Sequence, residues 1–460
     1  MKFFLQRLFV YTFLVSPSFA ENLPNIVFIN ADDLTYTDLS IYGGQAKTPN
    51  FDRLAAEGMT FSHCFQTAPM CSPTRHNLYT GIYPVKTGAY PNHTFAKEGT
   101  KSIVHHLKPH RYRVALSGKR HIAPESVFPF EYSGVKGNPD MEAVNALMLE
   151  SKSDGNPFCL FACSNEPHTP WNKGDPDLYP PAEITLPPYL IDTPETRKGF
   201  SKYLAEITYY DGQVGQILDL LEKHDLVEET IVMLSSEQGN SMPFAKWTLY
   251  DPGLRTALVV RWPGKIKPAS KTDAMVEYVD VVPTLLDAIG VDPVAEMDGK
   301  SFLSVLNGSA DEHKSHVFGI MTTKGIINGS DTYGIRSVRS RDYQLIVNLT
   351  PEVKFTNACT TSPEFLSWVR RAGAGKKRAS KFVNHYQHRP AVELYSTRGP
   401  WHGWNNLADK EEHASIRSEL EKKLEEWMSE QGDEGRATEE AAMEHQSKSR
   451  GKKKKSGKNK

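Results

Sequence analysis

The apolar residues of the chain fall into short runs separated by amphipathic stretches, from Asn25 to about residue 330. Short apolar runs bounded by turn-forming residues indicate buried strands, and the stretches between them indicate helices. Strands and helices that alternate in this way are typical of an α/β domain built on a largely parallel sheet. We predict strands at Asn25–Asn30, Arg113–Ser117, Pro157–Cys163, Thr230–Leu234 and Ala257–Arg261.

Three amphipathic stretches carry apolar residues at helical spacing. Asn50–Glu57 is followed by Gly58, and a glycine directly after the last periodic residue is a typical helix end. We expect further helices at Gly199–Lys223 and at Asp280–Ile289, which is followed by Gly290.

The pattern changes after residue 330. Tyr333–Val338 and Tyr343–Leu349 predict two strands joined by a short turn, and Ala391–Tyr395 predicts another strand. Glu411–Glu430 is charged and has helical spacing. Together these segments predict a smaller α+β domain over residues 331–431.

From Gly432 the chain is polar and poor in apolar residues, and it ends in a lysine-rich run at residues 451–460. Such a composition buries too little apolar surface to fold, so we predict a disordered basic tail over residues 432–460. A solvated tail is the simpler interpretation, and contact with an anionic polymer or surface is the alternative.

The N-terminus has the pattern of a targeting segment. Lys2 and Arg7 precede or flank an apolar run at Leu8–Val15, and Ser18-Phe19-Ala20 fits a small-residue cleavage site. This predicts a secretory signal peptide over residues 1–20 and a secreted or periplasmic protein. The apolar run is too short to span a bilayer, so we expect no stable membrane insertion.

Composition narrows the function further. The formal net charge is -1, which argues against a nucleic-acid partner. The 460 residues suffice for two or three domains. Export permits disulfides, but Cys64, Cys159, Cys163 and Cys359 can pair in three ways, and the sequence does not choose among them. The sequence does not predict an oligomeric state either.

Polar clusters follow the carboxyl ends of the predicted strands, the edge of an open α/β sheet where ligands bind. The first cluster is Asp32 and Asp33. Two adjacent buried carboxylates repel each other, and a divalent cation removes that cost. The pair therefore predicts a metal site, although by itself it would also fit a helix cap or a surface loop.

Cys71 stands in the second cluster. Pro73 fits the first turn of a helix, so Cys71 would lie at the helix N-terminus, where backbone amides favour anions. Arg75 follows one turn later on the same face. A buried structural cysteine is the alternative for any single cysteine.

Three further clusters supply charges and titratable groups. Lys119 and His121 are two residues apart and share a face of an extended chain. His168 is flanked by prolines that fix its backbone. Glu237 and Gln238 offer oxygens that suit a hard cation, and Lys246 follows them. One anion-binding and metal-binding site can be assembled from these clusters.

Cys71-Ser-Pro-Thr-Arg75, followed by Leu78-Tyr-Thr-Gly81, resembles the signature of the type I, formylglycine-dependent sulfatases. The resemblance implies an alkaline-phosphatase-like fold, with a large mixed sheet flanked by helices in a catalytic domain over residues 21–330. It also implies that a formylglycine-generating or sulfatase-maturating enzyme oxidises Cys71 to formylglycine, whose hydrated form attacks the sulfur of the substrate.

The same resemblance implies a role for each cluster. It implies one Ca²⁺ ion, a clamp of cations on the sulfate, and two histidines for proton transfer. His168 is our acid for the leaving group and His121 assists the later release of sulfate, although these two roles could be exchanged. The family usually carries Asp followed by Asn or His where this chain has Glu237 and Gln238, and each of these side chains is one methylene longer. The implied metal ligands are Asp32, Asp33, Glu237, Gln238 and the modified Cys71, and the implied clamp is Arg75, Lys119 and Lys246.

Several segments are most similar to heparan N-sulfatases (sulfamidases), which implies a sulfated saccharide as substrate and a role in glycosaminoglycan degradation. These segments are Gly118–Phe130, Pro187–Pro194, Ile335–Tyr343 and Glu393–Tyr395. The alternatives are an O-sulfatase on another sulfated glycan, a phosphatase or phosphonate hydrolase of the same superfamily, and a non-catalytic sulfated-glycan binding protein. Aromatic rings that could contact sugar are Trp171, Trp247, Trp401, His402 and Trp404.

Overall fold

The structure is a computed structural model that describes residues 23–398 and 405–447. The predicted signal peptide over residues 1–20 lies outside the described residues. So do Trp401, His402 and Trp404, and the last part of the predicted tail, residues 448–460. Within the described residues, none of the helices combines the length and the apolar character that a membrane-spanning helix needs.

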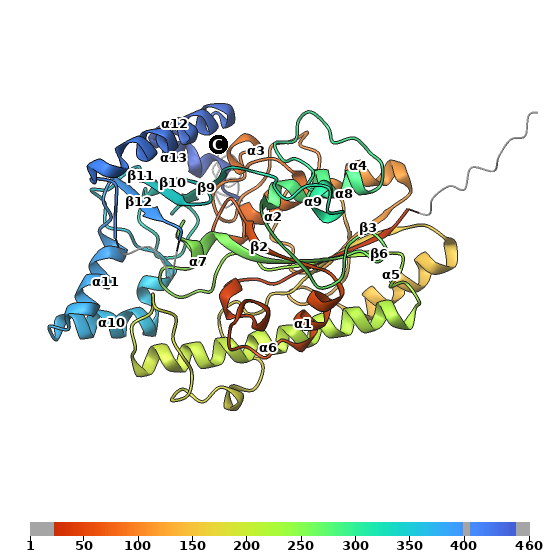
Figure 1. The fold of residues 1–460 in the computed structure, drawn as a ribbon, viewed down its shortest axis with the longest axis horizontal. Coiled ribbons are helices and arrows are strands. Elements are labelled where there is room, and N and C mark those ends of the chain that lie inside the picture. Colours follow the sequence, from red (N-terminus) through yellow and green to blue (C-terminus); the bar gives the residue numbers. More distant parts are fainter. Residues whose placement is uncertain (1–22, 399–404, 448–460) are drawn as a thin grey trace, which may run out of the picture.

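The centre of the molecule is an eight-stranded mixed sheet in the order β4-β3-β5-β1-β6-β7-β2-β8 (Figure 1). The first five strands in this order run parallel, β7 runs antiparallel to both of its neighbours, and β8 runs parallel to β2. The strands are β1 Asn25–Asn30, β2 Met59–Phe65, β3 Arg113–Gly118, β4 Glu131–Tyr132, β5 Phe158–Cys163, β6 Thr230–Ser235, β7 Arg255–Arg261 and β8 Ser270–Glu277.

Helices cover both faces of this sheet, so its central strands are buried on both sides. All six residues of β1 are buried, as are all six of β5 and of β6. Figure 1 shows α1 and α6 on one side of the sheet and α2, α4 and α8 on the other. The helices of this domain are α1 Pro49–Glu57, α2 Cys71–Thr80, α3 Pro84–Thr87, α4 Ile103–Leu107, α5 Met141–Asp154, α6 Pro194–Lys223, α7 Asp251–Leu254, α8 Val281–Ala288 and α9 Leu303–Leu306.

The predicted helices lie close to their expected positions, and their boundaries follow local capping. The Thr193 side chain accepts a hydrogen bond from the Thr196 amide, and Pro194 fills the first helical position, so α6 starts five residues before the predicted Gly199. The predicted helix at Asp280–Ile289 begins as a 3-10 turn at Tyr278–Asp280 and continues as α8.

The smaller domain is built on a four-stranded antiparallel sheet in the order β12-β11-β10-β9. Its first strand, β9, precedes residue 331. The helix α12 packs on β10 and β11. The elements are β9 Val317–Thr322, β10 Gly334–Arg339, β11 Tyr343–Asn348, α10 Pro363–Gly373, α11 Lys377–Gln387, β12 Val392–Ser396, α12 Ala414–Gln431 and α13 Arg436–Ala441.

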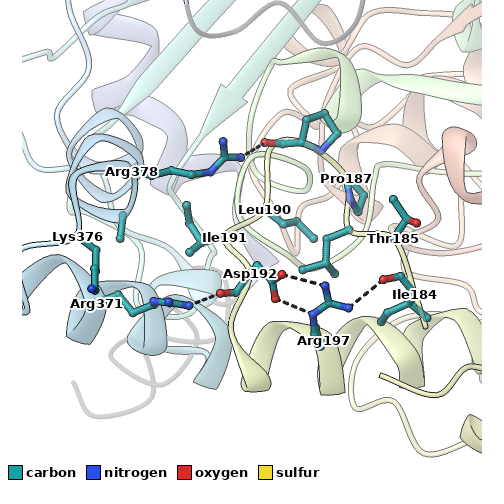
Figure 2. A pocket seen from close by; sticks show the side chains of 13 residues that line it. Ile184, Thr185, Pro187, Leu190, Ile191, Asp192, Arg197, Arg371, Lys376 and Arg378 are labelled. Atoms are coloured by element: carbon teal, nitrogen blue, oxygen red, sulfur yellow. Dashed lines mark hydrogen bonds and ion pairs between the residues drawn. The ribbon is translucent and has the colours of Figure 1, made fainter. Parts of the chain in front are cut away.

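The segment at residues 187–194, which leads into α6 of the larger domain, contacts both domains. It passes between α6 and the pair α10 and α11, beside a cavity of about 520 Å³ (Figure 2). The guanidinium of Arg197 on α6 binds both carboxylate oxygens of Asp192, at 2.6 and 2.8 Å. Arg378 on α11 donates to the Pro188 carbonyl at 2.8 Å, and Arg371 on α10 donates to the Asp192 carbonyl. These contacts hold the two helices of the smaller domain against α6.

The prediction of disorder from Gly432 onward is wrong for residues 432–447, which are folded. Asp433 and Glu439 are buried. Both carboxylates bind the fully buried guanidinium of Arg336 on β10, Glu439 at 2.9 Å and Asp433 at 3.1 Å. The composition of the segment is that of a tail, but its two acids have a buried cation about a hundred residues earlier in the chain.

This ion triad yields a stability prediction. Arg336→Ala leaves two carboxylates buried without their cation, so we expect the free energy of unfolding to fall by about 3–5 kcal/mol in urea denaturation. The matched control is Arg398→Ala, because Arg398 pairs with Asp342 at an exposed site where 75% of its side chain is accessible. That variant should change stability by no more than about 1 kcal/mol. Equal losses in the two variants would contradict the prediction.

Candidate active site

Cys71 is the first residue of α2, and all ten residues of this helix are buried. Met70 precedes it in extended conformation, and Pro73 lies in the first turn, as predicted. The Cys71 side chain therefore sits at the positive end of a buried helix, which favours an anion beside it.

Asp32 and Asp33 follow β1 and are fully buried. Gln238, which follows β6, bridges them. Its amide nitrogen Nε2 lies 3.0 Å from Asp32 Oδ1, 2.7 Å from Asp33 Oδ1 and 3.0 Å from Cys71 Sγ. The adjacent parallel strands β1 and β6 thus bring their carboxyl ends to the same point beside the cysteine, as the sheet-edge argument predicts.

Each of the two carboxylates has its own lysine. The ammonium of Lys119, which follows β3, contacts the Asp32 carboxylate and lies 4.0 Å from Cys71 Sγ. Lys246 Nζ lies 2.7 and 2.8 Å from the two Asp33 oxygens and 3.6 Å from Cys71 Sγ. Two buried acids and two lysines therefore surround the cysteine sulfur.

These charges set the ionisation of the site. Burial raises the pKa of Asp33, but Lys246 and then His168 more than offset it, so the pKa lies below its usual value. Burial raises the pKa of the Cys71 thiol to about 11, and Lys246 offsets this only in part. An unmodified Cys71 is therefore neutral near pH 7 and is a poor nucleophile.

Arg75 lies one turn along α2 and is fully buried behind the cysteine. Its Nη2 lies 2.6 Å from Glu237 Oε1, and its Nη1 donates to the Lys119 carbonyl at 2.9 Å. Asn30 also donates to Glu237 Oε1, at 3.0 Å. The other carboxylate oxygen of Glu237, Oε2, is buried without a hydrogen-bond partner among the described residues. Arg75 thus holds Glu237 and the Lys119 backbone from behind.

A cavity of about 890 Å³ opens over Cys71, and its wall includes His121, His168 and Lys246. His168 Nδ1 lies 2.6 Å from the Thr169 carbonyl, which makes Nδ1 the protonated nitrogen, and Nε2 lies 3.7 Å from Asp33 Oδ2. Burial, followed by the charge of Lys246, lowers the pKa of His168 to about 4. His168 and His121 therefore reach the same cavity from the loops after β5 and β3.

Both described tryptophans that we considered for sugar contacts, Trp171 and Trp247, line this cavity. Trp171 is half-buried, and its indole N–H donates to the Pro167 carbonyl at 2.9 Å. Trp247 is 6% exposed, with the Lys246 ammonium 4.7 Å from the centre of its ring. Trp171 therefore offers the more accessible aromatic surface to a ligand.

Several cavity residues were absent from the sequence-based site. His93 and Asn92 come from the loop after α3, and Ser241, which donates to the Asp33 carboxylate, comes from the loop after β6. Cys359 and Ile327 come from the smaller domain. A single sequence gives no signal for these residues, because they belong to loops that only the fold brings to the cavity.

The donor set fits a divalent cation. Ligand atoms of Asp32, Asp33, Cys71 and His168 lie within 4.8 Å of one another. The Gln238 carbonyl oxygen Oε1 is buried and has no hydrogen-bond partner within residues 23–398 and 405–447. If the Gln238 amide is rotated by 180°, Oε1 takes the place of Nε2 beside the two carboxylates. Three oxygens repel one another there unless a cation lies between them. Carboxylate and amide oxygens are the ligands that hard cations prefer.

Comparison with known proteins decides the family. The family model described as Sulfatase matches residues 24–291, which is more than half of the chain. The chain belongs to the sulfatase family. A second model, described as the C-terminal part of N-sulphoglucosamine sulphohydrolase, matches residues 239–355 of this sulfatase. The prediction of a sulfuric ester hydrolase similar to the sulfamidases is confirmed at the level of the family.

Individual relatives agree. An ulvan-active sulfatase of Formosa agariphila is 32% identical over 420 residues, covering 89% of this sulfatase and 81% of the relative. Human N-sulphoglucosamine sulphohydrolase is 25% identical over 454 residues, which cover 88% of this sulfatase and 89% of the relative. A solved structure of a protein in complex with its substrate D-glucosamine-2-N,6-O-disulfate superposes with a TM-score of 0.68 at 19% identity, covering 90% of this chain and 99% of that chain. The predicted alkaline-phosphatase-like fold is confirmed.

The donor set predicts that cation binding stabilises the folded sulfatase. After treatment with a chelator, adding a divalent cation should raise Tm by a few degrees, because an ion at about 100 times its Kd stabilises by ~2.7 kcal/mol. Asp33→Ala should abolish this rise. The matched control is Asp219→Ala on the exposed surface of α6, which should keep it. A cation response that Asp33→Ala leaves intact would contradict the assignment.

Proposed function

We propose that this sulfatase is exported and removes a sulfate group from a sulfated sugar, with formylglycine made from Cys71 and one Ca²⁺ ion. The observation that carries the proposal is the position of Cys71, at the start of a buried helix, between two lysines and beside a large cavity. The proposal includes a maturating enzyme that oxidises Cys71 and a signal peptide at residues 1–20.

Calcium suits the site better than a smaller ion. Ca²⁺ takes six to eight oxygen ligands in flexible geometry, whereas Mg²⁺ demands a near-ideal octahedron. The carboxylates of Asp32 and Asp33 and the buried Oε1 atom of Gln238 would supply the first ligands. Glu237, which the sequence also predicts as a ligand, lies outside the cluster of Asp32, Asp33, Cys71 and His168 and binds Arg75. When bound, the ion polarises the sulfate oxygens, and the formylglycine supplies the nucleophile.

A divalent cation held by the two carboxylates would free the two lysines. Lys119 and Lys246 neutralise Asp32 and Asp33 in the structure, a task that the ion would take over. Their ammonium groups are then available to bind sulfate oxygens beside Cys71, where a water-poor environment strengthens each contact. Lys246 lines the cavity directly, so it is the lysine that first meets the substrate.

His168 is our candidate for delivering the proton to the leaving group, a role in which it must also be protonated at Nε2 when the substrate is bound, and the negative charge of a bound sulfate favours that form. The Nδ1–H of His168 is committed to the Thr169 carbonyl, so Nε2 is the nitrogen that faces Asp33 and the cavity. A sugar oxygen or nitrogen leaves poorly without a proton, and a positioned histidine supplies one. His121, on the same cavity wall, is our candidate for assisting the release of sulfate.

The proposed substrate is based on the names of the relatives. One is named for ulvan and another for N-sulphoglucosamine, and the C-terminal model that matches residues 239–355 carries the second name. We therefore propose a sulfated saccharide of the N-sulfoglucosamine type.

The first test measures inorganic sulfate released by the matured protein from N-sulfated glucosamine and 6-O-sulfated glucosamine, with glucosamine 6-phosphate beside them. We expect release from the N-sulfated sugar that a chelator abolishes. Cys71→Ala should abolish turnover while the Tm is retained. The matched control is Cys64→Ala, because Cys64 is equally buried but lies in β2, and this variant should keep turnover.

The other outcomes separate the alternatives. Release from the O-sulfated sugar alone would keep the chemistry and replace the substrate. Faster release of phosphate than of sulfate would contradict the sulfatase proposal. No release from any sugar, with formylglycine confirmed by mass spectrometry, would favour a glycan-binding protein.

A second test addresses His168. His168→Ala should lower kcat on a sugar sulfate by about 10²–10⁴-fold, the usual contribution of a general acid. It should lower kcat much less on an aryl sulfate, because a phenolate leaves without a proton. Steady-state kinetics on both substrates checks the difference. Equal losses on the two substrates would contradict the assignment of His168 as the acid.

A further inference from the structure

His121 and His93 form a hydrogen-bonded pair in the cavity wall. His121 Nε2 lies 2.9 Å from His93 Nδ1, and the ring centres are 4.8 Å apart. The second ring nitrogen of His121, Nδ1, is buried without a hydrogen-bond partner among the described residues. The contact with His93 is thus the hydrogen bond that orients the His121 ring.

A hydrogen bond between two neutral imidazoles needs one donor and one acceptor, so the tautomers of the two rings are linked. Fixing Nε2 of His121 in one role leaves Nδ1 in the other. The partner of a catalytic histidine sets which nitrogen carries the proton, and His93 is the residue in that place.

The backbone adopts an uncommon conformation at both histidines. His121 has φ of 52° and His93 has φ of 55°, both in the left-handed region. Non-glycine residues persist there only where the surrounding structure holds them. The loop that carries His93 is therefore under constraint from its neighbours.

The C-terminal segment supplies that constraint. The Ser447 amide and hydroxyl donate to the His93 carbonyl, at 2.8 and 2.6 Å. Thr94 donates through its hydroxyl to the His445 carbonyl at 2.8 Å, and Gln446 donates to the Asn92 carbonyl at 3.2 Å. Residues 445–447 therefore bind the backbone on both sides of His93.

We propose that His93 is a positioning residue for the sulfatase reaction, which fixes the ring orientation and tautomer of His121, and that residues 445–447 hold His93 in place. The inference rests on the role assigned to His121 under the proposed function. The ion triad of Arg336, Asp433 and Glu439 fixes the chain just before residues 445–447. A role of residues 445–447 in holding His93 gives that anchoring a function.

Two substitutions of His93 separate the side chain from the backbone. Asn keeps a hydrogen-bonding group near the position of Nδ1 and tolerates positive φ, whereas Gly tolerates the backbone conformation but removes the side chain. We expect His93→Gly to lower kcat by about 10- to 100-fold, the usual cost of losing a residue that orients a functional histidine, with KM changed little. His93→Asn should retain most of kcat.

A third substitution tests the C-terminal segment. Ser447→Pro removes both donors to the His93 carbonyl, and Gln446 before it is already extended, as a residue before proline prefers. It should lower kcat in the wild-type background and much less in His93→Gly, because the two changes act through one interaction. Additive losses would overturn the role of residues 445–447.

The tautomer is read without any substrate. In protein labelled with ¹⁵N-histidine, the ring shifts of His121, assigned through His121→Gln, should differ between wild type and His93→Gly and be restored in His93→Asn. Unchanged shifts, or an unchanged kcat in His93→Gly, would overturn the inference. A wild-type protein that releases no sulfate would instead contradict the proposed function, and the ring shifts would still decide whether His93 sets the tautomer.

Discussion

The active site is organised around two adjacent carboxylates, Asp32 and Asp33, that are fully buried at the end of β1. Two neighbouring acids without water are strongly unfavourable unless positive charge reaches both of them. Lys119 and Lys246 supply that charge from two other loops at the same edge of the sheet. The requirement to neutralise this pair therefore brings together the cations that a sulfate needs.

The same arrangement places positive charge around the sulfur of Cys71. Cys71 begins α2, so backbone amides and two ammonium groups converge on its sulfur, and Arg75 on the same helix fixes Glu237 behind it. The smaller domain then closes one side of the cavity with Cys359 and Ile327. Its C-terminal segment reaches back to the loop of His93. Both domains are needed to shape the site.

The central strands and the site clusters could be predicted because buried parallel strands appear as apolar runs followed by polar loops. Strands β2, β8, β4 and β9 were not predicted, and β4 has only two residues. Ser62 and His63 interrupt β2, and β8 begins with exposed polar residues. The positions of Arg75 against Glu237 and of His93 against His121 depend on pairings between distant segments, which composition and spacing do not encode. The folding of residues 432–447 depends in the same way on Arg336.

The most direct test of this account is a crystal structure of the matured protein purified with calcium, with the ion located by anomalous diffraction. The account predicts one ion bounded by Asp32, Asp33 and the Oε1 atom of Gln238, with the ammonium groups of Lys119 and Lys246 turned from the carboxylates toward the cavity. A structure in which both lysines stay on the carboxylates in the presence of calcium, with no ion between the two acids, would contradict it.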